Sequence, residues 1–316
     1  MSTTADWDSF SAEQQRYHAK RMAVYAGMVD AMDHHIGRLV DYLKRSGQYD
    51  NTVFIFTSDN GSEASGGDNP RSPLLRLSLA MQSYNNNYET LGLKGSFNFI
   101  GPSFASAAAG PLDFYKFYAG EGGMRVPLIF AGAALPAQPR QTNALAYVTD
   151  IAPTILQLAG VSSPSSRYGG RPVEQMVGRS LLPLLSGEVQ RVYSESDTIG
   201  YELAGNAALF QGDYKIVRNR GPVGDGRWHL YNIVVDPGEA NDLSESMPQR
   251  LQSMLAEYEA YASHNGVRAL PDGYNEELQG VLNGVKDRFG PQLLLAVLTL
   301  LILIGFHIAY RSRRRS

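Results

Sequence analysis

A carboxylate and a side-chain amide stand next to each other directly after a short apolar run. Residues 53–56 (Val-Phe-Ile-Phe) are β-branched or aromatic, and the turn-forming residues Ser58, Asp59, Asn60 and Gly61 follow. We expect residues 53–56 to form a strand buried on both faces, as in parallel sheets, where ligands bind beyond the carboxyl ends of strands. Neighbouring carboxylate and amide oxygens suit Ca²⁺ or Mg²⁺ better than zinc. The alternative interpretation is an Asx turn that caps the strand.

A lysine precedes a glycine-rich turn further along the chain. Lys116 stands five residues before Glu121-Gly122-Gly123, and residues 126–131 form a second apolar run. Together with the turn at residues 58–61, this order resembles the sulfatase family of the alkaline-phosphatase-like superfamily, and the bacterial arylsulfatases in particular. The resemblance extends to about residue 270 through four further segments, which are residues 32–38, 99–102, 149–154 and 230–243.

The resemblance implies a role for each matching residue. Asp59 and Asn60 become metal ligands, with Ca²⁺ favoured over Mg²⁺, and Lys116 becomes the catalytic lysine that contacts the sulfate oxygens of the substrate. Residues 121–125 become a supporting turn, in which Arg125 is expected to be a structural ion-pair partner. The implied substrate is a sulfated small molecule, which the family hydrolyses at a divalent-cation site with a formylglycine nucleophile made from Cys or Ser in a Cys-x-Pro-x-Arg segment.

The nucleophile of that family has no counterpart in this sequence. The chain contains no cysteine, and Ser72-Pro73 lacks the required spacing. No aspartate before Asp59 follows a strand as part of an Asp-Asp pair. We therefore expect the formylglycine and half of the metal ligands to be missing, and the isolated chain to be inactive without an N-terminal complementing chain.

Two other functions remain open from the sequence. The first is a membrane-anchored, non-catalytic sulfatase remnant or binding module that keeps a partial ion site. The second is hydrolysis of phosphate mono- or diesters, because the superfamily shares its metal frame.

Helical and loop segments are expected to position these residues. Residues 13–45 show apolar side chains at helical spacing, which predicts a long helix with one buried face and with His34 and His35 as ordinary surface or packing residues. Residues 63–111 are rich in Gly, Ser, Asn and Pro and predict a functional loop. Lys94 is a lesser candidate there for sulfate contact, and Arg71 and Arg76 are further cations of the same segment.

The second half of the chain predicts a change of architecture. Thr149 or Asp150 can cap a helix that Gly160 ends, and short strands at residues 207–210, 214–219 and 228–231 then precede a helix at residues 248–264. The predicted fold class is α/β, a partial alkaline-phosphatase-like α/β/α sandwich with a small C-terminal antiparallel β+α subdomain and a C-terminal transmembrane helix. The predicted divisions are 1–189 (catalytic α/β portion), 190–269 (small subdomain), 270–291 (linker), 292–310 (transmembrane helix) and 311–316 (basic tail).

Composition and the two ends of the chain predict a membrane protein. The net charge of −3 gives no electrostatic footprint for nucleic acid. Residues 293–310 carry no Asp, Glu, Lys or Arg, and four arginines follow them, which favours a lipid-embedded single-pass anchor with a cytoplasmic tail and a periplasmic globular part. The N-terminus lacks a signal-peptide pattern, which favours the alternative of a cytosol-facing tail anchor.

Overall fold

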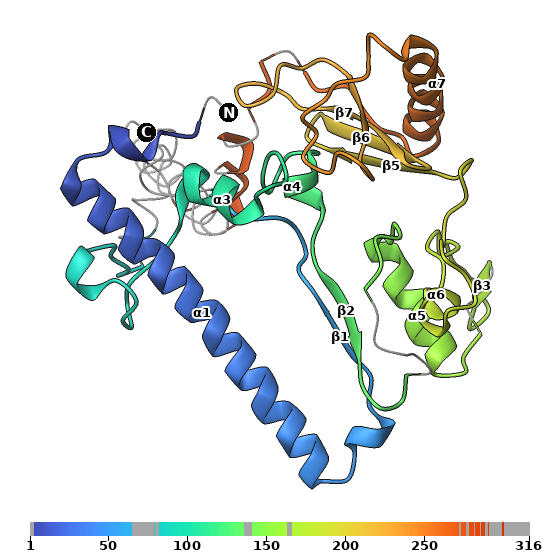
Figure 1. Cartoon of the computed structure of the whole chain (residues 1–316), viewed down its shortest axis with the longest axis horizontal. Helices are drawn as coiled ribbons and strands as arrows, with labels where there is room; N and C mark the ends of the chain where they lie inside the picture. Colours follow the sequence, from blue (N-terminus) through green and yellow to red (C-terminus); the bar gives the residue numbers. More distant parts are fainter. Residues whose placement is uncertain are drawn as a thin grey trace, which may run out of the picture.

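The structure is a computed structural model of the 316-residue chain (Figure 1). It describes residues 3–64, 79, 82–135, 141–162 and 166–271, together with the scattered positions 273–275, 278–280, 282–284, 286–287, 290 and 299.

The predicted N-terminal helix is confirmed as α1 (Ala12–Arg45). Ser11 and Gln14 form a capping box at its start, and Lys44 and Arg45 lie in its last turn, where cations favour the helix dipole. The first half of α1 is the packed half. Arg21 is only 1% exposed, and the Arg21 side chain donates a hydrogen bond to the carbonyl of Phe99.

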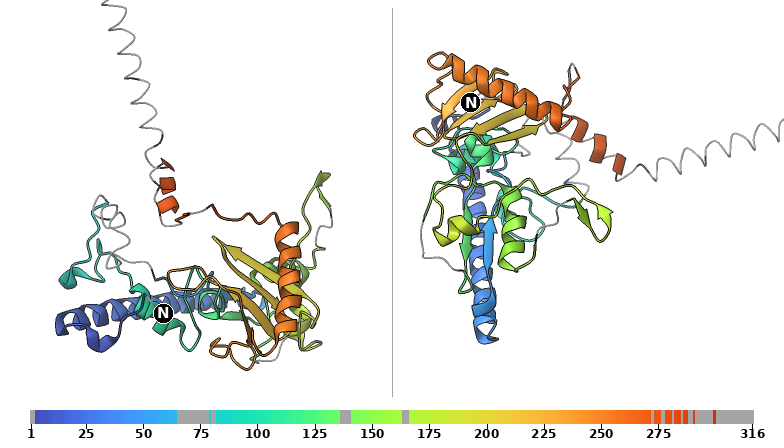
Figure 2. Two further views of the ribbon diagram at one scale, coloured as in Figure 1. Left: turned by 90° about the horizontal axis from the view of Figure 1, so that it is seen from above. Right: turned by 90° about the vertical axis from the view of Figure 1, so that its right-hand side faces the viewer.

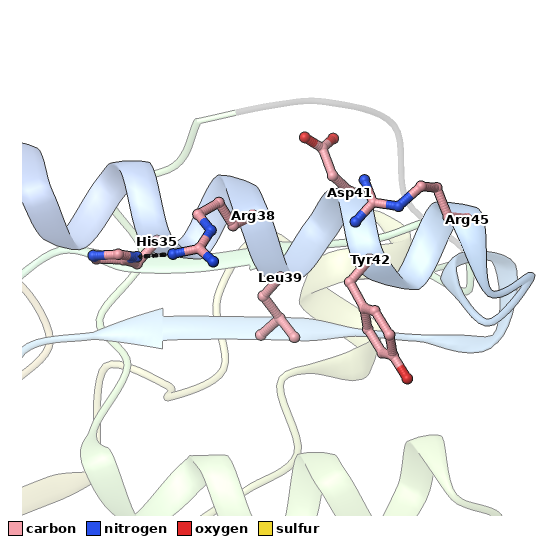
Figure 3. A pocket seen from close by; sticks show the side chains of 6 residues that line it. All are labelled: His35, Arg38, Leu39, Asp41, Tyr42 and Arg45. Atoms are coloured by element: carbon pink, nitrogen blue, oxygen red, sulfur yellow. Dashed lines mark hydrogen bonds between the residues drawn. The ribbon is translucent and has the colours of Figure 1, made fainter.

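The prediction that the apolar face of α1 is buried along its length is wrong. Met22 and Tyr25 pack against a small core, but most of the apolar side chains beyond them are exposed, including Met28 (61%) and Leu39 (51%). In Figure 3, Leu39 and Tyr42 extend from one side of the helix and Asp41 from the other. The reason is that no described element covers this part of α1, which extends away from the other elements in Figure 1. His34 and His35 are exposed on the same helix, as predicted.

The two central strands are confirmed, but their predicted parallel setting is wrong. Strand β1 (Phe54–Thr57) pairs with β2 (Leu128–Ala131) in an antiparallel, two-stranded sheet. The physical reason lies at one end of the pair, where the Gly61 N–H donates to the Gly123 carbonyl at 2.9 Å. This bond holds the chain leaving β1 beside the chain entering β2, so the strands run in opposite directions. Strand β1 is half-buried rather than buried on both faces.

The long segment after β1 includes regular secondary structure among its described residues. It contains helix α3 (Gly101–Ala109), and the very short α4 (Glu121–Met124) follows before β2. Ile100, Ala105 and Tyr115 form the core on which the first half of α1 packs.

The segment after β2 contains the predicted helix, capped differently from the prediction. Helix α5 covers Ile151–Leu158, and Gly160 follows with a φ of +67°, as expected for a helix end. Asp150 is fully buried, and its carboxylate accepts hydrogen bonds from the backbone N–H groups of Tyr147 and Arg179 and from the Tyr193 hydroxyl. Asp150 therefore occupies the predicted N-cap position of α5, but its side chain joins three segments instead of accepting a capping hydrogen bond from the helix.

The C-terminal antiparallel sheet and its helix agree with the prediction. The strands lie in the order β5 (Thr198–Leu203), β6 (Asn206–Gln211), β7 (Tyr214–Arg218) and β8 (His229–Asn232). Helix α7 (Pro248–His264) packs on this sheet, as Figures 1 and 2 show, with Met254 and Tyr258 in a core that includes Leu209, Ile216 and Leu230. The buried positions alternate between this core and a second one on the other sheet face, formed by Ala208, Phe210 and Val217. The assignment of this unit as a separate subdomain stays a prediction.

The remaining elements are short. They are the 3₁₀ turns η1 (Trp7–Ser9), η2 (Tyr49–Asn51), η3 (Tyr88–Thr90) and η4 (Val148–Asp150), the hairpin of β3 (Arg167–Tyr168) and β4 (Arg171–Pro172), and helix α6 (Leu182–Ser186).

The predicted membrane anchor must be corrected. Among the residues that the structure describes, no helix combines the length and the apolar character needed to cross a bilayer. The expected span at residues 292–310 lies outside the described residues, apart from Thr299. The transmembrane helix, the lipid bilayer as a partner and the single-pass localisation are therefore withdrawn.

Candidate active site

The turn after β1 presents the two predicted metal ligands. Asp59 is exposed and Asn60 half-buried. Hydroxyl groups stabilise the turn, since Ser58 Oγ donates to the Asn60 carbonyl at 2.9 Å and Thr57 Oγ1 to the Ser58 carbonyl at 3.0 Å. Within the described part of the chain, the side chains of Asp59 and Asn60 take part in no hydrogen bond or ion pair, so no Asx turn is observed there.

A very close backbone contact fixes this turn against the Glu-Gly-Gly turn. A Cβ atom on Gly61 would lie 1.9 Å from the Gly122 carbonyl oxygen, so only glycine fits. Gly123 is equally constrained, because a Cβ there would lie 2.3 Å from the carbonyl oxygen of Tyr118. The two turns that the sequence singled out therefore meet in space.

Lys116 lies beside the same turn. Its backbone N–H donates to the Ser62 carbonyl at 3.0 Å, and its Nζ forms an ion pair of 2.7 Å with Glu63 Oε2. Both side chains are partly exposed, at 41% and 50%. The hydrogen bond to Glu63 and the negative charges of Glu63 and Asp59 raise the pKa of Lys116, so the ammonium group stays charged at neutral pH.

The backbone around Lys116 is held in an uncommon conformation. Phe114 and Phe117 have φ values of +65° and +88°, a region that non-glycine residues rarely adopt. Two asparagines of the C-terminal sheet region stabilise this loop. Asn219 Oδ1 accepts from the Ala119 N–H at 2.7 Å, and Asn206 Nδ2 donates to the Phe117 carbonyl at 3.2 Å.

A cluster of buried charged side chains contacts the Glu121-Gly122-Gly123 turn. Lys215 on β7 forms ion pairs of 2.9 Å with both Glu121 and Glu239, and Arg125 forms an ion pair of 2.6 Å with Glu121. Burial by itself raises the pKa of Glu121, but the charges of Lys215 and Arg125 outweigh burial and lower the pKa overall. The contact of Arg125 matches the structural role expected for it.

Three contributors to the site were missed by the sequence reasoning. Glu63, Lys215 and Glu239 carry no local motif that marks them. The only available signal was an acidic residue in the turn at residues 236–239, which was interpreted as an ordinary turn.

The oxygen donors of the turn fit a hard cation in kind but not in number. Asp59 and Asn60 offer at most three side-chain oxygens, whereas Ca²⁺ takes six to eight oxygen ligands. No cluster of three or more His, Cys, Asp or Glu side chains suited to a metal ion occurs among the described residues. Asp59 and Asn60 would therefore form only part of a cation's shell.

Of the other candidate cations, the structure describes only Lys94. Lys94 is exposed on the segment between η3 and α3. Arg71, Arg76 and Ser72-Pro73 lie outside the described residues. A shallow hollow lined by His35, Arg38, Asp41 and neighbouring side chains lies on α1, in a different part of the molecule (Figure 3).

Comparison with known proteins finds related structures and sequences. The fold is similar to the crystal structure of Ps i-CgsB in complex with k-i-k-neocarrahexaose, with a TM-score of 0.52 and 27% identity over 81% of this chain and 46% of that chain. An uncharacterized sulfatase of Schizosaccharomyces pombe is 34% identical over 90% of this chain and 50% of its own length. The arylsulfatase of Klebsiella aerogenes is 32% identical over 56% of this chain and 37% of its own length.

A match to the Sulfatase family covers residues 2–161. The chain therefore belongs to the sulfatase family, whose members are sulfuric ester hydrolases, and the predicted resemblance is confirmed. The chain spans about half of the length of the Schizosaccharomyces pombe relative and 37% of the Klebsiella enzyme.

Proposed function

We propose that this chain supplies the anion-binding side, and part of the cation-binding side, of a sulfate-ester hydrolase. The observation that carries the proposal is the placement of Lys116 beside the Asp59-Asn60 turn, at a contact that only glycines allow. The substrate class is a sulfated small molecule, and the relatives include an arylsulfatase. Calcium is favoured over magnesium on the resemblance to the bacterial arylsulfatases, and the carboxylate and amide oxygens of Asp59 and Asn60 suit a hard cation of this kind.

Each residue has a defined part in this proposal. Lys116 binds a sulfate oxygen and stabilises the charge that develops during S–O cleavage, after Glu63 has released the ammonium group. Asp59 and Asn60 would hold the cation, which neutralises negative charge on the sulfate group when it is bound. The nucleophile does not come from this sequence, which has no cysteine.

A complementing N-terminal chain follows as part of the proposal. The apolar face of α1 and the outer edges of the β1–β2 pair have no neighbour among the described elements, and such surfaces favour partner binding. The partner would bring the nucleophile and the missing ligands.

The cation site can be tested on the chain as it stands. We expect isothermal titration calorimetry to show weak, one-site Ca²⁺ binding that Asp59→Asn abolishes and that Asp8→Asn, an exposed control, leaves unchanged. Ca²⁺ binding that survives Asp59→Asn would place the ion elsewhere and overturn the assignment.

Activity is tested with aryl sulfate and aryl phosphate side by side. We expect no turnover by the isolated chain, and sulfate turnover once an N-terminal sulfatase half with a Cys-x-Pro-x-Arg segment is co-expressed. Lys116→Ala in the complemented protein should reduce kcat/KM for aryl sulfate by roughly 10²-fold or more. Faster phosphate turnover would favour a phosphate-ester hydrolase. A folded complex with no turnover on either ester would favour a binding module.

A further inference from the structure

A fully buried charged side chain, that of Lys215, contacts the Glu-Gly-Gly turn that adjoins the candidate site. Lys215 on β7 is fully buried, and its Nζ lies 2.9 Å from Glu121 Oε1 and 2.9 Å from Glu239 Oε1. Glu239 follows β8 in the turn at residues 236–239, and Glu239 Oε2 accepts a hydrogen bond of 2.7 Å from the backbone N–H of Glu121. One lysine thus joins a sheet strand, the Glu-Gly-Gly turn and the turn after β8.

The cluster is balanced in charge. Two carboxylates, those of Glu121 and Glu239, face two cations, those of Lys215 and Arg125, and only Arg125 is substantially exposed. Removing one partner from such a buried set leaves the others without compensation, which is far more disruptive than replacing the whole set by apolar side chains. The position of Glu121 is consequently tightly specified.

A short path leads from Glu121 to the proposed ligands. Gly122 and Gly123 follow Glu121, and neither has room for a side chain, because the carbonyl oxygens of Phe114 and Tyr118 lie within 2.4 Å and 2.3 Å of where a Cβ would be. The Gly123 carbonyl accepts the hydrogen bond from the Gly61 N–H at 2.9 Å. A shift of Glu121 must therefore move Gly61, and with Gly61 the adjacent residues Asn60 and Asp59.

The same turn also bears on Lys116. The Gly122 N–H donates to the Asp113 carbonyl at 2.7 Å, and Gly123 lies against the carbonyls of Tyr115 and Tyr118, which flank Lys116 and Phe117 in the chain. The Asp59-Asn60 turn and the loop that carries Lys116 are thus both held in place by contacts with residues 121–123.

We propose that Lys215 and Glu239 are positioning residues, which set the geometry of the Asp59-Asn60 turn and of Lys116 through the Glu121-Gly122-Gly123 turn. Neither residue contacts the site directly. The structural coupling between the C-terminal sheet and Gly61 is inferred from the observed contacts alone. The effect of this coupling on ion binding rests on the proposed function.

Glu239→Gln is the most informative variant, because glutamine has nearly the same shape as glutamate. The Glu239 carboxylate accepts from the Glu121 N–H through Oε2 and forms an ion pair with Lys215 Nζ through Oε1, whereas an amide has a single oxygen and turns its NH₂ group toward one of these two donors. The matched control is Met254→Ala, which lowers stability by leaving a cavity in the core under α7 without touching residues 121–123. Asp197→Asn, which breaks the Arg179–Asp197 ion pair elsewhere, is a second control.

The readout is amide hydrogen exchange in the full chain, measured by mass spectrometry on peptides that contain Gly61, residues 121–123 or β6. We expect Glu239→Gln to accelerate exchange at Gly61 by roughly fivefold or more relative to Met254→Ala, with similar exchange of β6 in the two variants. Equal exchange at Gly61 in Glu239→Gln and Met254→Ala would overturn the proposal. Lys215→Met should give a larger effect at Gly61, and if that variant does not fold, the comparison above still decides.

Calorimetry with Ca²⁺ on the same variants separates this inference from the proposed function. If the wild-type chain binds Ca²⁺, we expect a severalfold weaker affinity in Glu239→Gln and an unchanged affinity in Asp197→Asn. An unchanged Ca²⁺ affinity in Glu239→Gln would remove the link to the site. A wild-type chain that binds no Ca²⁺ would count against the cation site, while the exchange at Gly61 would still confirm or overturn the coupling.

Discussion

Lys116 is held by a carboxylate that competes with any anionic ligand. Its ammonium group lies 2.7 Å from Glu63 Oε2, and both side chains are partly exposed. Exposed ion pairs contribute about 0.2–1 kcal/mol, so Glu63 shields the lysine without sequestering it. In the proposed function, Glu63 would compete with the sulfate group for Lys116, while its negative charge keeps the ammonium group of Lys116 protonated.

Neutralising this competitor should improve anion binding. We expect Glu63→Gln to bind inorganic sulfate about two- to fivefold more tightly than the wild-type chain, because Lys116 no longer exchanges a carboxylate for the ligand. Sulfate titration followed by calorimetry measures the difference, with Glu13→Gln on the exposed start of α1 as the control. Weaker sulfate binding by Glu63→Gln would show that Glu63 orients Lys116 instead of competing for it.

The Gly61 contact makes an equally sharp prediction. Gly61→Ala should lower the free energy of unfolding by about 1–3 kcal/mol, because the new methyl group would overlap the Gly122 carbonyl and the two turns must separate. The control is Gly37→Ala on α1, where a Cβ meets nothing within 4 Å. That change should stabilise the chain by about 0.5–1 kcal/mol. Urea unfolding of both variants gives the values, and a neutral effect of Gly61→Ala would mean that the turns are not locked together.

At the scale of elements, His229 joins β8 to the chain that leads into α7. Its Nδ1 lies 2.7 Å from Asp242 and its Nε2 3.0 Å from Asp225. Partial burial by itself lowers the pKa of His229, but the two carboxylates outweigh burial and raise the pKa above its ordinary value. The protonated imidazole is therefore stabilised in the folded state.

The sign of the pH dependence follows from that raised pKa. The stabilisation by His229 is fully present below the unfolded-state pKa of about 6.5 and declines as the pH rises through the higher folded-state pKa. The difference in unfolding free energy between the wild type and His229→Gln should therefore be larger at pH 6 than at pH 8. Urea unfolding of the wild type and of His229→Gln at both pH values tests this prediction.

The elements that could be predicted from the sequence are those whose sequence patterns lie within the element itself. The predicted ends of helices α1 and α7 and of strands β6 and β7 agree with the structure to within one residue. Their signals, which are periodicity and turn residues, lie within each segment. Asp59, Asn60 and Lys116 were found through a family pattern of local motifs. The antiparallel pairing of β1 and β2 was not predictable, since it depends on a contact between Gly61 and Gly123. Glu63 and Glu239 act through partners that are near only in the folded chain.

At the scale of the whole molecule, an apolar surface along α1 stands out. We define it by the exposed residues Met28, Val29, Met32, Ile36, Leu39 and Tyr42. The sequence periodicity correctly predicted that these side chains lie on one face of α1. It also predicted that this face is buried, but none of the described elements packs against it. An uncovered apolar face of this extent favours association.

This surface predicts self-association of the isolated chain. We expect sedimentation velocity to show oligomers at micromolar concentration and expect the double variant Met32→Glu, Leu39→Glu to shift the chain toward the monomer. Val177→Glu alters an exposed apolar side chain (82%) away from α1 and should leave the distribution unchanged. A monomeric wild-type chain would show that α1 needs no cover, and would weaken the case for a complementing N-terminal chain.

Two lysines near the candidate site, Lys116 and Lys215, differ in their accessibility to chemical reagents. Lys116 is 41% exposed and Lys215 is fully buried between two glutamates. Amine-selective reagents should modify Lys116 readily, and reach Lys215 only when the β7 strand and the Glu-Gly-Gly turn part. Modification of Lys215 therefore reports the separation of strand β7 from the Glu-Gly-Gly turn. Its labelling rate, with Lys116 as the internal reference, gives the frequency with which the C-terminal sheet releases the site.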